Sequence, residues 1–231
     1  STHPLIVLDG EGGSGHGFTL NSTADGSTIR GLVIRDFSAD GIHIDSGSDN
    51  HTIVGNYIGS FNADGSNAGA GERNGSEGIE SYGANVLIGG TTAADRNVIS
   101  GNTSAYNIYL ATGANGTIVR GNYIGTDAAG ASAFTSTNSA YGIMLEHSAT
   151  NVTIGGAASG AGNVISGFSN RGVWVTTTGT VTVQGNKIGT DATGTIDLGN
   201  AGYGLYVDDG GTFTIGRSEE HTSELQSHHD L

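Results

Sequence analysis

Short segments in which apolar and polar residues alternate recur along most of the chain. One set begins with glycine, or with Asn107 in one copy, and continues apolar, variable, apolar. Its members are GIHID (41–45), GIESY (78–82), NIYLA (107–111), GIMLE (142–146), GVWVT (172–176) and GLYVD (204–208). A second set alternates Val, Ile or Phe with Thr, as in NVTIGG (151–156), TVTVQG (180–185) and TFTIG (212–216). A period of two is the pattern of a strand, so these segments predict short β-strands separated by glycine-rich turns.

A recurring asparagine gives the period of the repeat. It stands in the contexts GN-x-I and RN-x-I, at Asn56, Asn97, Asn122, Asn163 and Asn186. The intervals are 41, 25, 41 and 23 residues, so long and short coils alternate and a two-coil unit repeats every 64–66 residues. A fixed period at this scale predicts one small structural unit that is stacked many times.

Two folds are compatible with many short strands, an antiparallel sandwich and a parallel β-helix. Equivalent residues at equivalent positions favour the β-helix, because each strand then pairs with its counterpart one coil away, about 4.8 Å distant. We therefore predict an all-β, right-handed parallel β-helix of about seven coils over 1–216, an architecture that resembles the pectate-lyase-like superfold. One inward column is expected to comprise Ile42, Ile79, Ile108, Ile143, Val173 and Leu205. A second comprises Ile44, Leu110, Leu145, Val175 and Val207, with Ser81 as its weak point.

The five repeated asparagines are predicted to form a structural ladder. In a stack of parallel coils, each side-chain amide can donate a hydrogen bond to the amide of the next coil. Buried amides require such partners. We therefore interpret these asparagines as buried turn residues and not as catalytic groups or glycan acceptors.

Several motifs now resemble a known repeat. VLDG, STIRGLVIRDFSADGI, TIVGNYIG, GNVISG and GNKIGTD are similar to the right-handed β-helix repeats of large secreted or surface-attached bacterial proteins. The resemblance covers essentially 1–216. It implies an extracellular or cell-surface setting, a structural or adhesive role, and neighbouring coils of a longer solenoid as partners. The alternative is a carbohydrate-active β-helix, either a polysaccharide lyase or hydrolase or a glycan-binding module, with an incomplete site in these residues.

The last fifteen residues, RSEEHTSELQSHHDL, break the pattern. They lack strand alternation and carry many charges. Residues 217–227 match the translation of a common sequencing adapter, and a six-base index in its usual place accounts for 228–231. A natural helical tail is the alternative, since Glu and Leu favour helix. We expect 217–231 to be a non-native tail and 1–216 to be the β-helix domain.

The composition argues against several classes of partner and scaffold. The formal net charge is −14 and Lys187 is the one lysine, whereas a nucleic-acid partner requires a basic face. No stretch of the sequence reaches the length of an apolar membrane span. The absence of cysteine excludes a disulfide scaffold. We expect no nucleic acid, no membrane span, and a polysaccharide or surface protein as partner.

The strongest candidate for a contact surface is one outward column. The middle residues of the Gly-apolar-x-apolar strands are His43, Glu80, Tyr109, Met144, Trp174 and Tyr206. The last four are expected to stack over about 15 Å at the coil spacing, with Glu146 and Asp208 at the rim. Such a stripe predicts either local packing under one of the long loops 61–76 and 128–140, or contact with a glycan or a partner.

Catalytic and metal motifs are weak. Asp208 and Asp209, with the SGHG segment around His16, resemble the motifs of polygalacturonase-like hydrolases, but their order is reversed and they lie several coils apart. No complete catalytic set is predicted. The segments GTDAAG and GTDATG place Asp127 and Asp191 where loop carbonyls can complete a Ca²⁺ site. The same spacing is typical of a plain Asx-turn, and no other cofactor is expected.

Overall fold

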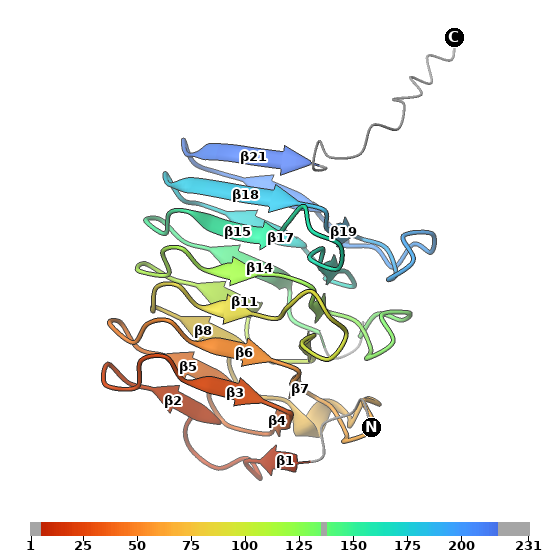
Figure 1. Ribbon diagram of the computed structural model, residues 1–231. Coiled ribbons are helices and arrows are strands. Elements are labelled where there is room, and N and C mark those ends of the chain that lie inside the picture. Colours follow the sequence, from red (N-terminus) through yellow and green to blue (C-terminus); the bar gives the residue numbers. More distant parts are fainter. Residues whose placement is uncertain (1–5, 135–137, 217–231) are drawn as a thin grey trace.

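Three parallel sheets of seven strands each wind around a common axis. The computed structural model describes residues 6–134 and 138–216, which form a right-handed parallel β-helix of seven coils (Figure 1). The predicted tail, 217–231, lies outside the described residues. Apart from one 3₁₀ turn, η1 (Ala70–Glu72), all regular elements in the described part are strands. No helix in 6–134 or 138–216 has the length and apolar character needed to cross a membrane.

Each coil contributes one strand to each sheet. Sheet A contains β1 (Ile6–Asp9), β4 (Leu32–Arg35), β7 (Tyr57–Gly59), β10 (Val98–Ser100), β13 (Tyr123–Ile124), β16 (Val164–Ile165) and β19 (Lys187–Ile188). Sheet B contains β2 (Phe18–Leu20), β5 (Ile42–Ile44), β8 (Ile79–Ser81), β11 (Tyr106–Leu110), β14 (Tyr141–Leu145), β17 (Val173–Val175) and β20 (Leu205–Val207). Sheet C contains β3 (Thr28–Arg30), β6 (Thr52–Val54), β9 (Leu87–Ile88), β12 (Ile118–Val119), β15 (Val152–Gly155), β18 (Thr180–Gln184) and β21 (Thr212–Gly216).

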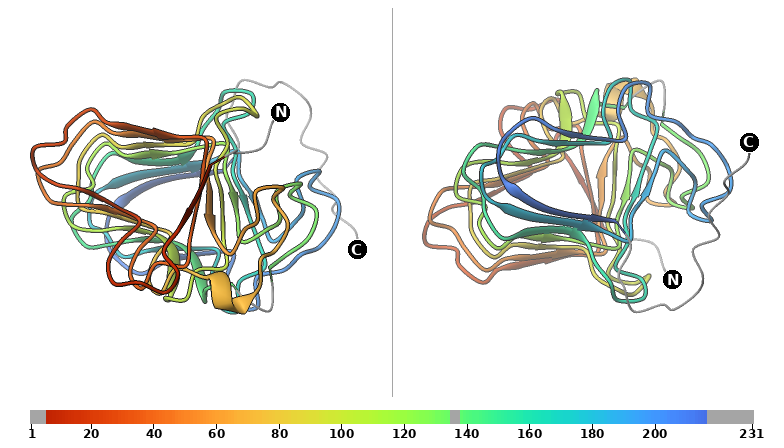
Figure 2. Two further views of the ribbon diagram at one scale, coloured as in Figure 1. Left: turned by 90° about the horizontal axis from the view of Figure 1, so that it is seen from below. Right: turned by 90° about the horizontal axis from the view of Figure 1, so that it is seen from above.

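All strand neighbours within the three sheets pair in parallel, so the antiparallel sandwich is wrong. The register of sheet B joins Ile108 to both Ile79 and Ile143, one coil on either side. Seen along the axis, the sheets enclose one continuous interior (Figure 2). Side chains of both predicted columns fill it, and Ile42, Ile108 and Leu145 are completely buried. Ser81 is also fully buried in its column, and its hydroxyl makes one long hydrogen bond, 3.4 Å to the carbonyl of Gly83.

The predicted asparagine ladder is present at the turn that leads into sheet A. The amide of Asn97 donates to the Asn122 Oδ1 at 3.0 Å, and that of Asn122 donates to the Asn163 Oδ1 at 3.0 Å. Asn56 and Asn186 extend the ladder at its two ends through bonds of 3.1 and 2.8 Å. Each amide oxygen also accepts a backbone N–H from the preceding coil. The ladder therefore satisfies backbone and side chain together.

A second asparagine ladder lies between sheets A and B. Its side chains donate in sequence, Asn74 to Asn102, Asn102 to Asn107, and Asn107 to Asn138, at 3.0, 2.7 and 3.0 Å. The amide of Asn138 ends the series on the carbonyls of Gly125 and Gly167. This ladder satisfies backbone groups where the long loops leave the coils.

The described parts of the long loops pack on sheet A. The loops after β7, β13 and β19 project from one side of the molecule (Figure 2). Phe61 and Phe134 from two of these loops pack on Val33, Tyr57 and Val98, on the outside of sheet A. These contacts give no support to packing of the sheet B stripe under a long loop, and residues 135–137 of the second loop lie outside the described residues.

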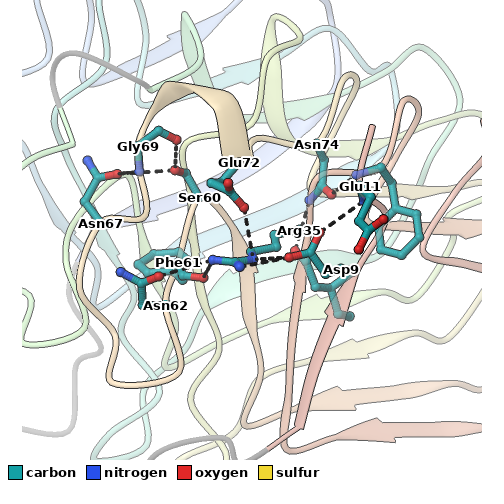
Figure 3. A network of polar contacts seen from close by, with 12 residues as sticks. Asp9, Glu11, Arg35, Ser60, Phe61, Asn62, Asn67, Gly69, Glu72 and Asn74 are labelled. Carbon is teal, nitrogen blue, oxygen red and sulfur yellow. Dashed lines mark hydrogen bonds and ion pairs between the residues drawn. The ribbon is translucent and has the colours of Figure 1, made fainter. Parts of the chain in front are cut away.

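Arg35 fixes the first long loop to the bottom coils (Figure 3). Its guanidinium donates to Asp9 at 2.8 and 2.9 Å and to the Phe61 carbonyl at 3.3 Å. It also lies 3.3 Å from a carboxylate oxygen of Glu72, the last residue of η1. The loop that it holds leads directly into Glu77 and β8.

Gly89 provides a test of how closely the coils approach each other. It has a φ of +83°, and an added Cβ would lie 2.1 Å from the carbonyl oxygen of Arg120 and 2.3 Å from the Oδ1 of Asn122. We expect Gly89→Ala to lower the free energy of unfolding by more than about 2 kcal/mol, because backbone strain and a steric clash combine.

Gly31→Ala is the matched control. Gly31 has a similar φ of +76° with open space around an added Cβ. Its substitution is therefore expected to show only the backbone cost, about 1 kcal/mol. Urea unfolding of both variants measures the difference. If both variants lose the same free energy of unfolding, the steric clash at Gly89 does not contribute to the loss.

Candidate functional site

The outward face of sheet B carries two adjacent columns of functional side chains, which we call the B face. The first is the predicted column, which the register orders as His43, Glu80, Tyr109, Met144, Trp174 and Tyr206. The second consists of the residue that precedes the glycine, or Asn107, at the start of each strand segment. Its members are His16, Asp40, Glu77, Tyr106, Tyr141, Arg171 and Tyr203. Backbone hydrogen bonds from Gly17 to Asp40, Gly41 to Glu77 and Gly142 to Arg171 place successive members on successive coils.

An acid–imidazole cluster occupies the lower coils of the B face. It comprises His16, Asp40, His43, Glu77 and Glu80. The Oδ2 of Asp40 lies 2.9 Å from the Nδ1 of His16 and 2.9 Å from the Nδ1 of His43. The same Nδ1 of His43 lies 2.8 Å from the Oε2 of Glu80. The Asp40 side chain is only 2% exposed and that of His43 is 17% exposed, so these contacts are shielded from water.

The carboxyl groups of the cluster are held by further donors. The Oδ1 of Asp40 accepts the backbone N–H of Glu77 at 3.0 Å. The Tyr82 hydroxyl donates to Glu80 at 2.9 Å, and the Ser104 hydroxyl donates to Glu77 at 2.7 Å. These bonds fix the orientation of the carboxylates.

The pKa values of the residues in and around the cluster are shifted in different directions. Burial alone would raise the pKa of Asp40, but hydrogen bonds from His43, Ser76 and the Glu77 backbone outweigh it and lower the pKa. Burial and the charge of Asp40 raise the pKa of Glu80. Burial favours neutral His43, yet its hydrogen bond to Asp40 and the nearby carboxylates raise its pKa. Burial and the bond to Glu80 raise the pKa of Tyr82 to about 12. The cluster can therefore hold a proton or a cation.

An aromatic–arginine platform occupies the upper coils of the B face. It comprises Tyr106, Tyr141, Arg171, Trp174, Tyr203 and Tyr206. The Cζ of Arg171 lies 4.4 Å from the ring centre of Trp174 and 4.3 Å from that of Tyr206. Tyr141 and Trp174 have ring centres 5.3 Å apart, and those of Tyr203 and Tyr206 are 5.0 Å apart. These ring pairs are tilted by 36° and 42° and surround one guanidinium, a favourable cation–π arrangement.

The predicted stripe residues lie in the expected order but differ in exposure. Met144 is 5% exposed, whereas Tyr109, Trp174 and Tyr206 are half-buried. Their neighbours in the second column cover their flanks. Of the predicted rim residues, Glu146 accepts a hydrogen bond from the Tyr109 hydroxyl, and exposed Asp208 lies 3.4 Å from the Tyr206 hydroxyl. The four stripe residues are therefore flanked by side chains of the second column and do not form a bare stripe.

The two Ca²⁺ candidates lie in equivalent loops outside sheet A, away from the B face. Asp191 accepts backbone N–H groups from Thr195 and Ile196 and the hydroxyl of Thr193. These bonds outweigh desolvation and lower the pKa of Asp191 to about 2. Asp127 accepts the N–H of Ala131 at 2.9 Å. Donors of the turn thus occupy carboxylate oxygens that a cation would need.

Sequence reasoning missed the second column of the B face. The combination that it considered, His16 with Asp208, is separated by the full height of sheet B, from β2 to β20. The actual partners of His16 are Asp40 and His43, on the next coil. An alignment of the residue before each repeated glycine, or before Asn107, would have placed His16, Asp40 and Glu77 in one column with four of the six platform residues.

Comparison with protein-family models, with curated proteins and with solved structures gave no match. The fold is therefore defined by the parallel register of the strands, and the specific repeat family stays a prediction. The functional argument rests on the chemistry of the B face.

Proposed function

We propose that the protein binds a neutral glycan chain lying along the B face. The observation that carries the proposal is that an aromatic platform and a cluster of oriented carboxylates share one face of one sheet, in line along the coil axis. A chain that follows the axis meets both.

The platform supplies the apolar part of such a site. Sugar rings present apolar faces that stack on Tyr and Trp, whose rings give a large rigid contact area. Tyr203 is 56% exposed, and Tyr206 and Trp174 are partly exposed beside it. Since exposed apolar surface on a soluble protein marks contact sites, this end of the B face is suited to stacking.

The carboxylates supply the polar part and favour an uncharged chain. Carboxylate oxygens accept hydrogen bonds from sugar hydroxyls. The chain carries a net charge of −14, and Asp45, Glu80, Glu146 and Asp208 lie on or beside the B face. Repulsion therefore disfavours a uronate polymer. An extracellular or cell-surface setting is part of the proposal and is supported by the repeat motifs.

The test is calorimetric titration with cellohexaose, xylohexaose and mannohexaose, with hexagalacturonate as the acidic counterpart. We expect at least one neutral chain to bind and the acidic chain to bind more weakly. Tyr203→Ala should weaken binding at least about tenfold, as removal of a central aromatic contact does. Because Tyr203 is exposed, the melting temperature should change little.

Tyr123→Ala is the matched control. Tyr123 also lies under an arginine, with the Cζ of Arg96 4.0 Å from its ring centre, but on sheet A. Its removal should leave glycan affinity unchanged. Absence of binding to every neutral chain, or equal losses in both variants, would contradict the proposal. Preferential binding of hexagalacturonate would contradict its charge argument.

A further inference from the structure

Three side-chain atoms from two successive coils converge at the lower end of the B face, and a fourth atom from the next coil lies beside them. They are the Nδ1 of His16, the Oδ2 of Asp40, the Nδ1 of His43 and the Oε2 of Glu80. Consecutive atoms in this series are 2.9, 2.9 and 2.8 Å apart. The first three lie within 4.8 Å of one another. Because β2, β5 and β8 are hydrogen-bonded neighbours, the sheet itself holds the series in place.

If both imidazoles are neutral, this arrangement leaves unfavourable contacts between hydrogen-bond acceptors. The backbone N–H of Asp40 points to the Nδ1 of His16 at 3.2 Å, so that nitrogen presents a lone pair and not a proton. The same nitrogen faces the Oδ2 of Asp40 at 2.9 Å, so two lone pairs oppose each other. His43 offers one Nδ1 proton to two carboxylate oxygens. A cation between these atoms removes the conflict.

We propose that His16, Asp40 and His43 bind a divalent first-row transition-metal ion, with the Glu80 carboxylate beside them, 2.8 Å from the Nδ1 of His43. Imidazole nitrogen combined with carboxylate oxygen is a ligand set for Zn²⁺ and its neighbours, whereas Ca²⁺ takes oxygen ligands almost exclusively. Bonds of about 2.1 Å place adjacent ligand atoms about 3.0 Å apart at octahedral angles and about 3.4 Å apart at tetrahedral ones. The 2.9 Å spacings of Asp40 from both imidazoles match the octahedral edge. The three ligands belong to the polar end of the proposed glycan site, and a metal titration tests them without any glycan.

Further hydrogen bonds orient the side chains of this group, as is typical of metal sites. The second oxygen of Asp40 accepts the Glu77 N–H, and the second oxygen of Glu80 accepts the Tyr82 hydroxyl. The free Nε2 of His43 faces Asp45 at 3.3 Å. Outer partners of this kind orient metal ligands and raise their basicity. The His16 side chain remains 30% exposed, which leaves a path for the ion.

A second group of acidic residues differs from this cluster, because an arginine lies beside its carboxylates. Asp9, Asp36 and Glu72 also bring their carboxylates together near β1 and β4. There the guanidinium of Arg35 lies 2.8 Å from Asp9 and 3.3 Å from Glu72 (Figure 3). The arginine already supplies the positive charge, so this group carries no metal proposal. It provides a control for non-specific binding.

The experiment is titration of metal-free protein with Zn²⁺ at pH 7.5, with Ca²⁺ in parallel. We expect one Zn²⁺ per chain and much weaker binding of Ca²⁺. His43→Ala and the near-isosteric Asp40→Asn should each weaken Zn²⁺ binding at least tenfold. His147→Ala, with its side chain 73% exposed outside the cluster, and Asp9→Asn should leave it unchanged.

Co²⁺ gives a second readout on the unaltered protein, so the test does not depend on the folding of any variant. Its visible spectrum should show a saturable nitrogen-ligated site that Zn²⁺ displaces. Absence of one-to-one binding, or binding that survives His43→Ala, would overturn the proposal and leave a protonated histidine network. Loss of binding in Asp9→Asn would place the ion elsewhere. Glycan titration in EDTA separates this outcome from that of the proposed function.

Discussion

Asn122→Ala is expected to lower the free energy of unfolding by about 3–5 kcal/mol, because several buried polar groups lose their partners at once. The side chain is fully buried in the middle of the first asparagine ladder. Its amide donates to Asn163 Oδ1 and to the carbonyls of Ile88 and Arg120. Its oxygen accepts both the side-chain amide and the backbone N–H of Asn97. Urea unfolding followed by circular dichroism measures the loss.

Two further variants show whether hydrogen bonds or volume cause the effect. Asn122→Leu keeps the volume without any polar group, and should be about as destabilising as the alanine because the neighbouring groups remain unpaired. Asn115→Ala is the control, since exposed Asn115 only accepts the N–H of Thr150 at 2.9 Å. It should cost less than about 1 kcal/mol. Full stability of Asn122→Leu would show that the ladder only fills space.

The coil architecture could be predicted because each coil repeats the same pattern on the same three sheets. Ile108 and Ile143 stand at equal offsets from their repeated glycine or asparagine, and the parallel register pairs them directly. In a solenoid, equal offset in sequence means adjacency in space. For the same reason Asn97 and Asn122, which are 25 residues apart, could be expected to touch.

Only part of the second asparagine ladder could be predicted in this way. Asn74 and Asn138 lie in long loops, and each stands four residues before the repeated glycine, at Gly78 and Gly142. Asn102 stands five residues before Asn107, and Asn107 replaces a glycine that other coils have at that position. A periodic alignment therefore shows an incomplete column. These residues meet because the loops fold back on the coil edge, which depends on contacts such as those of Arg35 and Phe134.

Only one of the two columns of the B face could be predicted from the sequence pattern. The outward column was predictable from strand alternation, whereas Asp40 and Arg171 lie just before the strands, in turns that strand alternation does not describe. Their side chains nevertheless join the same face, as the contacts of Asp40 with His43 and of Arg171 with Trp174 demonstrate. The chemistry of the face changes from acidic to aromatic between Glu77 and Tyr106. The division into an acidic and an aromatic half is visible only when both columns are considered together.

Trp174→Ala is expected to weaken neutral-glycan binding at least about 30-fold, since a central tryptophan typically contributes 2 kcal/mol or more to a contact. Trp174 lies at the centre of the platform, between Tyr141 and Arg171. Its neighbours Val173 and Val175 are fully buried, so Trp174 points outward and its loss leaves the core intact. The accompanying loss of stability should be about 1–2 kcal/mol, below the 3–5 kcal/mol of a core aromatic.

Measurement of affinity and stability on the same variants separates binding from packing. Trp174→Phe retains an aromatic ring against Tyr141 and should keep most of the affinity, and Tyr203→Ala should lose affinity at nearly constant stability. Because the Cζ of Arg171 lies 4.4 Å from the ring centre of Trp174 and 5.7 Å from that of Tyr203, the losses of Trp174→Ala and Tyr203→Ala need not add. A Trp174→Ala protein that loses 3–5 kcal/mol of stability and binds every glycan as before would show that the platform is local packing. In that case the carboxylates of the lower coils would have to act without a stacking surface, and the proposal of a glycan along the whole B face would be wrong.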